Sequence, residues 1–149
     1  IVIAAGGGGV PVAERDGCLF GVDAVVDKDL SCARMAEDLG ADMLMILTAV
    51  DRVCIHFNSP NQKALSQMSV QEAKNYIAEG QFAPGSMLPK VEACIEFVEK
   101  NPWGEAVITS LEQAPNVFSN QSGTRVISQL SAENKIKELR SVDHALPNA

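Results

Sequence analysis

Two alternating hydrophobic patterns constrain the fold of this chain more than any other feature of its sequence. Residues 42–48 (DMLMILT) are almost continuously apolar, which is typical of a central strand covered on both faces. Residues 29–39 before this run, and residues 90–100 after it, place their apolar side chains on one helical face. Strands that alternate with helices in this way predict an α/β fold, with a mostly parallel sheet and helices on both of its faces.

The other expected elements are shorter. Further strands are predicted at residues 1–5, 22–26, 52–57, 106–111 and 123–127. Asp16-Gly17 is a hairpin-turn signal, and the capping box from Ser69 to Glu72 predicts a helix that ends near Glu79. A last helix is predicted at residues 131–140, within a C-terminal tail.

Composition excludes several classes of protein. The 149 residues suffice for one domain, and their 46% hydrophobic and 21% charged content is that of a globular protein. A net charge of −7 argues against nucleic acid or a membrane as partner, and no apolar run reaches the roughly 18 residues of a membrane span. The four cysteines are interpreted as reduced thiols of a cytoplasmic protein, and no set of metal ligands is identified: Cys18, Cys32, Cys54 and Cys94.

The four glycines Gly6, Gly7, Gly8 and Gly9 follow the first expected strand. They do not form a dinucleotide fingerprint, because Pro11 stands where its third glycine belongs, and no Gly-Lys-Ser/Thr of a P-loop occurs. Two interpretations stay open. The run is either a tight turn that needs positive φ, or a turn whose backbone N–H groups line an anion site.

The triplet Asp27-Lys28-Asp29 comes between an expected strand and an expected helix. Either aspartate can cap the helix, and capping alone would explain the triplet. Alternatively, an aspartate keeps the lysine charged and aimed, so that the ammonium group can neutralise a phosphoryl group in transfer. The triplet, the glycines and Thr48 to Val50 all follow expected strands, so we expect them at one edge of the sheet.

A third motif is FAPGSMLPKVEAC at residues 82–94. A glycine-containing loop leads into a helix, and Lys90 lies in the first turn of that helix. Loop N–H groups, the helix dipole and the lysine would then converge on one anion. The alternative is a surface lysine at a tolerated position.

Taken together, four stretches resemble the carbamate kinases of the amino acid kinase family. They are IVIAAGGGGVPV, GVDAVVDKDLSCARMAEDLGADMLMILTAVDRVCI, FAPGSMLPKVEACIEFVE and AVITSLEQA with SGTRV. The resemblance covers roughly residues 1–126, which it identifies as the C-terminal, nucleotide-binding lobe; residues 127–149 are an additional helix or tail. It implies a three-layer α/β/α sandwich.

The resemblance also implies an activity. Carbamate kinases move a phosphoryl group between ATP and carbamate, and in arginine catabolism they form ATP from ADP and carbamoyl phosphate. The implied cofactors are ATP or ADP and Mg²⁺, and the implied assembly is a cytoplasmic homodimer.

Site residues follow from the same resemblance. Lys28 and Lys90 match the family's phosphate-binding lysines, and Asp27 matches the aspartate that orients them. The implied nucleotide-binding residues are Thr48, Ala49, Val50, Asp51, Gly85, Ser86, Met87 and Lys90. The implied substrate- or phosphoryl-binding residues are Gly6, Gly7, Gly8, Gly9 and Asp29.

One departure limits these implications. The chain starts at Ile1, inside an expected strand, without Met, and the family's N-terminal glycine loop and further lysine are absent from it. We therefore interpret the chain as a C-terminal fragment that is inactive without its N-terminal half. A relative with another acceptor, or a nucleotide-binding domain without catalysis, stays open as an alternative.

Overall fold

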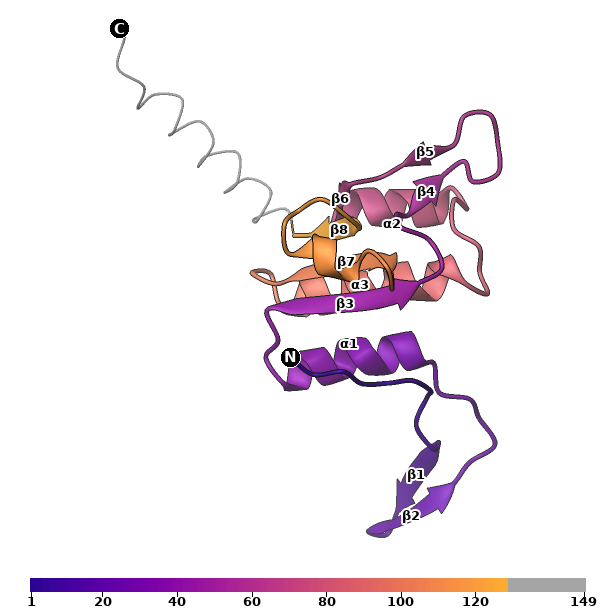
Figure 1. Ribbon diagram of the computed structural model, residues 1–149. Coiled ribbons are helices and arrows are strands. Elements are labelled where there is room, and N and C mark those ends of the chain that lie inside the picture. Colours follow the sequence, from indigo (N-terminus) through magenta and orange to yellow (C-terminus); the bar gives the residue numbers. More distant parts are fainter. Residues whose placement is uncertain (129–149) are drawn as a thin grey trace, which may run out of the picture.

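A four-stranded mixed sheet forms the centre of the protein, whose residues 1–128 are described by a computed structural model (Figure 1). Its strands are β3 (Met43–Thr48), β7 (Glu105–Ser110), β8 (Thr124–Ile127) and β6 (Gln67–Ser69), in that spatial order. β3 pairs with β7 in parallel and β6 with β8 in parallel, whereas β7 and β8 are antiparallel. The predicted α/β fold with a mostly parallel sheet is therefore confirmed.

Three helices pack together against this sheet. They are α1 (Lys28–Asp38), α2 (Val70–Ala78) and α3 (Met87–Lys100). α3 contacts β3, β7 and β8, while α1 and α2 each pack against α3 and against a strand of the sheet. The periodic apolar residues of the helices meet the strand residues in one core, which includes Ala33, Ala36, Leu44, Ile46, Val91, Cys94, Val98, Ala106 and Ile108.

The segment after β7 covers the opposite face of the sheet. It contains a 3₁₀ turn, η1 (Ala114–Val117), which contacts β7. Val107 and Val117 are both 0% exposed, although Val107 alternates along β7 with Ala106 and Ile108 of the helix-side core. Both faces of β7 are thus buried, which explains the continuous apolar run in its sequence. Within residues 1–128, this second cover is a 3₁₀ turn and loop instead of the expected α-helices.

The first 26 residues differ most from the predictions. Residues 1–5 and 22–26 form no strands, and Ile3 and Val25 are each 97% exposed. Between them lies a hairpin of β1 (Val12–Arg15) and β2 (Cys18–Gly21). Its turn residues Asp16 and Gly17 have φ of 53° and 75°, as the hairpin signal predicted. Both apolar runs were wrongly predicted as strands, and Ile3 and Val25 stay exposed because nothing in the described residues packs over them.

Local signals placed the remaining elements better. The capping box of Ser69 and Glu72 is present and begins α2. The strand expected at residues 52–57 shrinks to β4 (Cys54–Ile55), which pairs with β5 (Lys63–Ala64), because His56 and Asn58 adopt positive φ. All four cysteines are free, as expected. None of the helices in residues 1–128 has the length and apolarity to cross a membrane. The helix expected at residues 131–140 lies outside the described residues.

Candidate functional site

The first turns of two helices and the last residues of two strands meet at one edge of the sheet. α1 returns to β3 through residues 39–42, and α3 returns to β7 through residues 101–104, so each helix runs opposite to the strand that follows it. In Figure 1 the tip of β3 and the first turns of α1 and α3 lie on the right. Thr48 and Ser110 end their strands side by side as register partners. This is the edge at which α/β sheets bind ligands.

Asp29 joins the two predicted lysines at this edge. Lys28 Nζ lies 2.8 Å from Asp29 Oδ1, and Lys90 Nζ lies 2.7 Å from Asp29 Oδ2. The side chains of Asp29 and Lys90 are 7% and 13% exposed, whereas that of Lys28 is 42% exposed. The structure therefore brings the two ammonium groups to one carboxylate, with Lys28 open to solvent.

The charges of this Lys28–Asp29–Lys90 cluster support one another. Burial alone would raise the pKa of Asp29, but the hydrogen bonds from Lys28 and Lys90 outweigh it and hold the pKa below its ordinary value. The hydrogen bond to Asp29 raises the pKa of Lys28. Both groups are therefore charged at neutral pH. Asp27 is a second carboxylate near this cluster, and its charge adds to the rise of the pKa of Lys28.

Asp27 takes the helix-capping role, which is one of the two roles that the sequence left open for the aspartates of the triplet. Its Oδ1 accepts hydrogen bonds from the backbone N–H groups of Asp29 (2.8 Å) and Leu30 (3.1 Å), so it caps α1. The contact with both lysines, which the resemblance implied for Asp27, is made by Asp29 instead. A signal was present in the sequence: Asp29 stands four and seven residues before the buried Ala33 and Ala36, on the face that packs toward α3.

The glycine run passes beside the segment that leads into α1. A Cβ on Gly8 would clash with the carbonyl oxygen of Val26, whereas Cβ atoms on Gly6, Gly7 and Gly9 would meet open space. None of the four glycines has positive φ; the left-handed residue is Ala5, with φ of 55°. The interpretation that these glycines need positive φ was therefore wrong. The backbone of Gly8 instead lies close to the backbone just before Asp27.

The start of α3 is open toward an anion. Ser86 is its N-cap residue but makes no side-chain capping hydrogen bond, and the first turn contains no acidic residue. Lys90 lies near this end, so the helix dipole and the lysine both favour negative charge there. Gly85 and Met87 flank Ser86, and a Cβ on Gly85 would meet open space.

The strand-end segment Thr48–Asp51 is held from a side that the sequence analysis missed. Ser110 Oγ donates to Asp51 Oδ1 at 2.6 Å, and Thr109 Oγ1 donates to the Asp51 carbonyl oxygen at 3.3 Å. Thr109 and Ser110, which carry these hydroxyl groups, are the last two residues of β7. Their places opposite Leu47 and Thr48 in a parallel pair were the available signal, but it needed the strand order.

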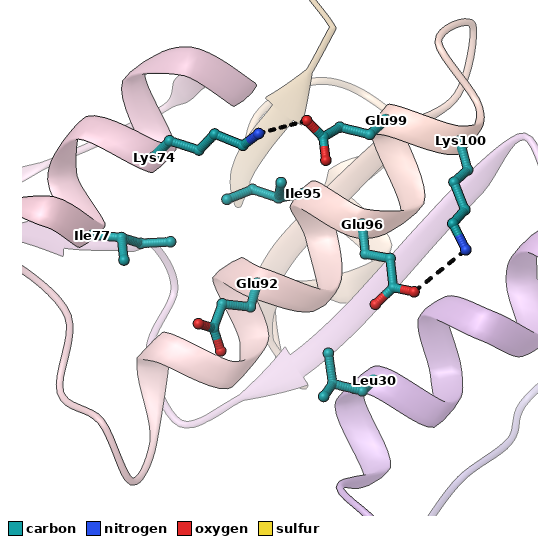
Figure 2. Close-up of a pocket in the computed structure, with 8 residues that line it drawn as sticks. All are labelled: Leu30, Lys74, Ile77, Glu92, Ile95, Glu96, Glu99 and Lys100. Carbon is teal, nitrogen blue, oxygen red and sulfur yellow. Dashed lines mark hydrogen bonds and ion pairs between the residues drawn. The ribbon is translucent and has the colours of Figure 1, made fainter.

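The other two features concern a groove among the helices and a possible metal site. A groove of about 410 Å³ lies among the three helices and is lined by Leu30, Lys74, Ile77, Glu92, Ile95, Glu96, Glu99 and Lys100 (Figure 2). Lys74 pairs with Glu99 at 2.7 Å and Lys100 with Glu96 at 3.5 Å, so its charges are largely matched. No group of three His, Cys, Asp or Glu side chains gathers in residues 1–128 in a way that would hold a metal ion.

Comparisons with known proteins show what the sequence and the fold resemble. The chain is 55% identical over 127 residues to a carbamate kinase of Clostridium perfringens and 52% identical over 124 residues to one of Latilactobacillus sakei. These alignments cover 85% and 83% of this chain and 40% of each relative. A structure of carbamate kinase from Giardia lamblia bound to AMP-PNP matches with a TM-score of 0.78 and 39% identity, over 82% of this chain and 38% of that one.

The chain therefore spans about 40% of the length of the curated relatives that it matches. The model of the Amino acid kinase family matches residues 1–110, which is most of the chain. The sheet, the helices and the lysine cluster all lie within or next to this match. On these grounds, the protein belongs to the amino acid kinase family.

Proposed function

We propose that this chain is the C-terminal, nucleotide-binding half of a phosphotransferase that moves a phosphoryl group between ATP and carbamate. The proposed direction is ATP formation from ADP and carbamoyl phosphate, in arginine catabolism. The similarity to carbamate kinases supports the reaction class. The single observation that carries the proposal is the contact of Lys28 and Lys90 with the two oxygens of Asp29.

This cluster suits phosphoryl transfer on chemical grounds. The transferred group spreads its negative charge over three oxygens, so catalysis consists mainly of positioning and of charge compensation. In the proposed site Lys28 and Lys90 supply the compensating charge, and Asp29 fixes the direction of both ammonium groups. Asp27 acts indirectly by capping α1, which sets the position of Asp29.

The nucleotide is proposed to bind between the two helix starts and the strand ends. The Giardia lamblia relative is described as bound to AMP-PNP, which supports nucleotide binding as such. Lys90 and the segment from Gly85 to Met87 would face the phosphates, and Thr48 to Asp51 would hold the remainder of the nucleotide. Gly6 to Gly9, beside Val26, are proposed to face the acceptor.

Mg²⁺ fits this site only as an ion that arrives with the nucleotide. Mg²⁺ is commonly held by substrate phosphates, waters and one or two carboxylates, and the described residues provide no larger set of protein ligands. When bound, the ion would neutralise part of the phosphate charge. The contributions of Lys28, Lys90 and Asp29 do not depend on such a set.

The proposal includes partners. The apolar side chains of Ile1, Ile3 and Val25 are exposed, which supports an N-terminal half of the same protein as the partner of residues 1–26. By analogy with the resemblance, the complete protein is proposed to be a homodimer. The four free cysteines support a cytoplasmic location.

A coupled assay of ATP formation tests the proposal. The full-length polypeptide that contains this chain is incubated with ADP, Mg²⁺ and carbamoyl phosphate, and ATP is measured. Turnover with carbamoyl phosphate, at a rate well above that with acetyl phosphate or other acyl phosphates, is the expected result. Turnover only with another acyl phosphate would assign a different acceptor, and ADP binding without any turnover would overturn the proposed catalysis.

A further inference from the structure

We propose that Ser110 is a positioning residue, which sets the affinity for the nucleotide by holding Asp51 at the strand-end edge. This inference rests on the proposed nucleotide role of Thr48 to Asp51. It adds to that proposal a residue which neither the motifs nor the resemblance singled out. The observation behind it is the 2.6 Å hydrogen bond from Ser110 Oγ to Asp51 Oδ1.

The hydroxyl group of Ser110 is fully used. Besides donating to Asp51, its Oγ accepts a hydrogen bond from the backbone N–H of Gln113 at 3.2 Å. Ser110 is 3% exposed, so its hydroxyl group is largely screened from water. One buried hydroxyl group therefore connects the end of β7, the loop that follows β7 and the loop that follows β3.

Neighbouring bonds hold the backbone of the same loop. Thr109 Oγ1 donates to the Asp51 carbonyl oxygen at 3.3 Å and lies 3.1 Å from Ser122 Oγ. The next residue, Arg52, donates from Nη2 to the carbonyl oxygen of Gln121 at 3.2 Å. The loop after β3 is thus attached at consecutive residues to segments that lie 58 and 69 positions later in the chain.

Further along the loop, the backbone N–H of Val53 donates to Thr124 Oγ1 at 2.8 Å. Val53 and Thr124 are both 0% exposed, which makes this bond a fixed anchor. Asp51 differs from Val53, because it is exposed. The structure therefore presents an accessible carboxylate on a loop whose backbone is held, and the hydrogen bond from Ser110 holds its side chain within residues 1–128.

This arrangement separates positioning from general stabilisation. Without the Ser110 hydroxyl group, Thr109 and Thr124 still hold the backbone of the loop at Asp51 and Val53, so the fold is expected to persist. What changes is the direction of the Asp51 carboxylate, which regains free rotation about its side-chain bonds. Ordering it again on binding lowers the affinity for a ligand that contacts it.

The test measures ADP binding to the full-length polypeptide by isothermal titration calorimetry, without carbamoyl phosphate. Ser110→Ala is expected to raise the dissociation constant for ADP about tenfold, while the KM for carbamoyl phosphate stays within about twofold. The matched control is Ser119→Ala, which removes a hydroxyl group from the segment after η1, where it donates to the Asn116 carbonyl oxygen at 3.0 Å. This control is expected to leave both values unchanged.

A double-mutant cycle shows whether Ser110 acts through Asp51. In an Asp51→Ala background, Ser110→Ala is expected to change the dissociation constant for ADP by less than about twofold. An unchanged affinity in the single Ser110→Ala variant, or the same tenfold loss in both backgrounds, overturns the inference. If circular dichroism shows that Ser110→Ala is unfolded, the dissociation constant for ADP is measured on Ser110→Cys, which keeps a similar size but weakens the donor. A raised dissociation constant then supports the inference, and an unchanged one overturns it.

The outcomes also separate this inference from the proposed function. ADP binding that weakens in Ser110→Ala, in a protein that does not use carbamoyl phosphate, supports the positioning role and refutes the carbamate kinase reaction. Turnover of carbamoyl phosphate with unchanged ADP affinity in Ser110→Ala supports the carbamate kinase reaction and refutes the positioning role. Absence of any ADP binding to the wild-type protein overturns both.

Discussion

Lys90 Nζ lies 2.7 Å from Asp29 Oδ2, although 61 residues separate the two in the chain. The contact ties the first turn of α3 to the first turn of α1, and Lys28 completes it from the second oxygen of Asp29. An ammonium group that is 13% exposed is retained there only because a carboxylate compensates its charge. The same relationship gives the proposed site its main testable consequences.

Removal of the Lys90 ammonium group is expected to reduce catalysis strongly. In the full-length protein, Lys90→Ala should lower kcat for ATP formation by about 10²–10³-fold, because a preorganised charge donor is lost at the transferred group. Lys74→Ala is the matched control, since Lys74 pairs with Glu99 on an exposed helix surface. The control should keep kcat within about twofold. Equal activity of Lys90→Ala and wild type would refute the proposed role of the cluster.

Asp29→Asn is expected to affect both stability and activity. The substitution keeps the size of the side chain but leaves Lys28 and Lys90 without their negative partner. We expect a loss of about 2 kcal/mol in the free energy of unfolding, measured by urea denaturation, together with a lower kcat. Asp38→Asn tests the specificity of the effect, because Asp38 makes only a surface ion pair with Arg34 in the described residues. A comparable loss in Asp38→Asn would contradict the interpretation.

The stabilising effect of Asp29 should disappear in acid. Its pKa in the folded protein lies below the ordinary 3.8, so its contribution is complete above that pH and is lost as the pH falls through the lower, folded-state value. The difference in unfolding free energy between wild type and Asp29→Asn should therefore be constant from about pH 7 to about pH 5 and shrink below pH 3.8. Urea titrations at a series of pH values measure it. A difference that shrinks already near neutral pH would show that another group is responsible.

Among the four N-terminal glycines, only Gly8 is expected to resist substitution by alanine. A Cβ at this position would clash with the Val26 carbonyl oxygen, whereas Gly7 has open space around it. We expect Gly8→Ala to destabilise the protein by about 1–3 kcal/mol and Gly7→Ala to be neutral or slightly stabilising. Thermal unfolding of both variants compares them directly. Similar melting temperatures would show that the backbone of the glycine run moves away from Val26 at little cost.

Local signals and distant contacts contributed differently to what the sequence could predict. The apolar run at residues 42–48 and the capping box at Ser69 predicted β3 and α2, because the information for both lies within a few residues. Residues 1–5 and 22–26 were predicted as strands from their apolar and β-branched composition alone. Burial depends on what packs over a segment, and in the described residues nothing covers Ile3 or Val25.

The candidate site shows the same division. The two lysines were found from their motifs. The aspartate that contacts both of them could be chosen only by knowing which one faces α3; the resemblance favoured Asp27, which caps α1, whereas Asp29 makes the contact. Ser110 could not be associated with Asp51 without knowing that β3 and β7 are neighbours in parallel register. Sequence motifs identified groups that can bind a phosphate, while the residues that fix those groups became visible only with the strand order.

The bridge at Asp29 has a mechanical consequence. Each of its two oxygens holds a lysine from a different helix. One carboxylate therefore sets the spacing of the two ammonium groups, and a substitution of either lysine also changes the surroundings of the other.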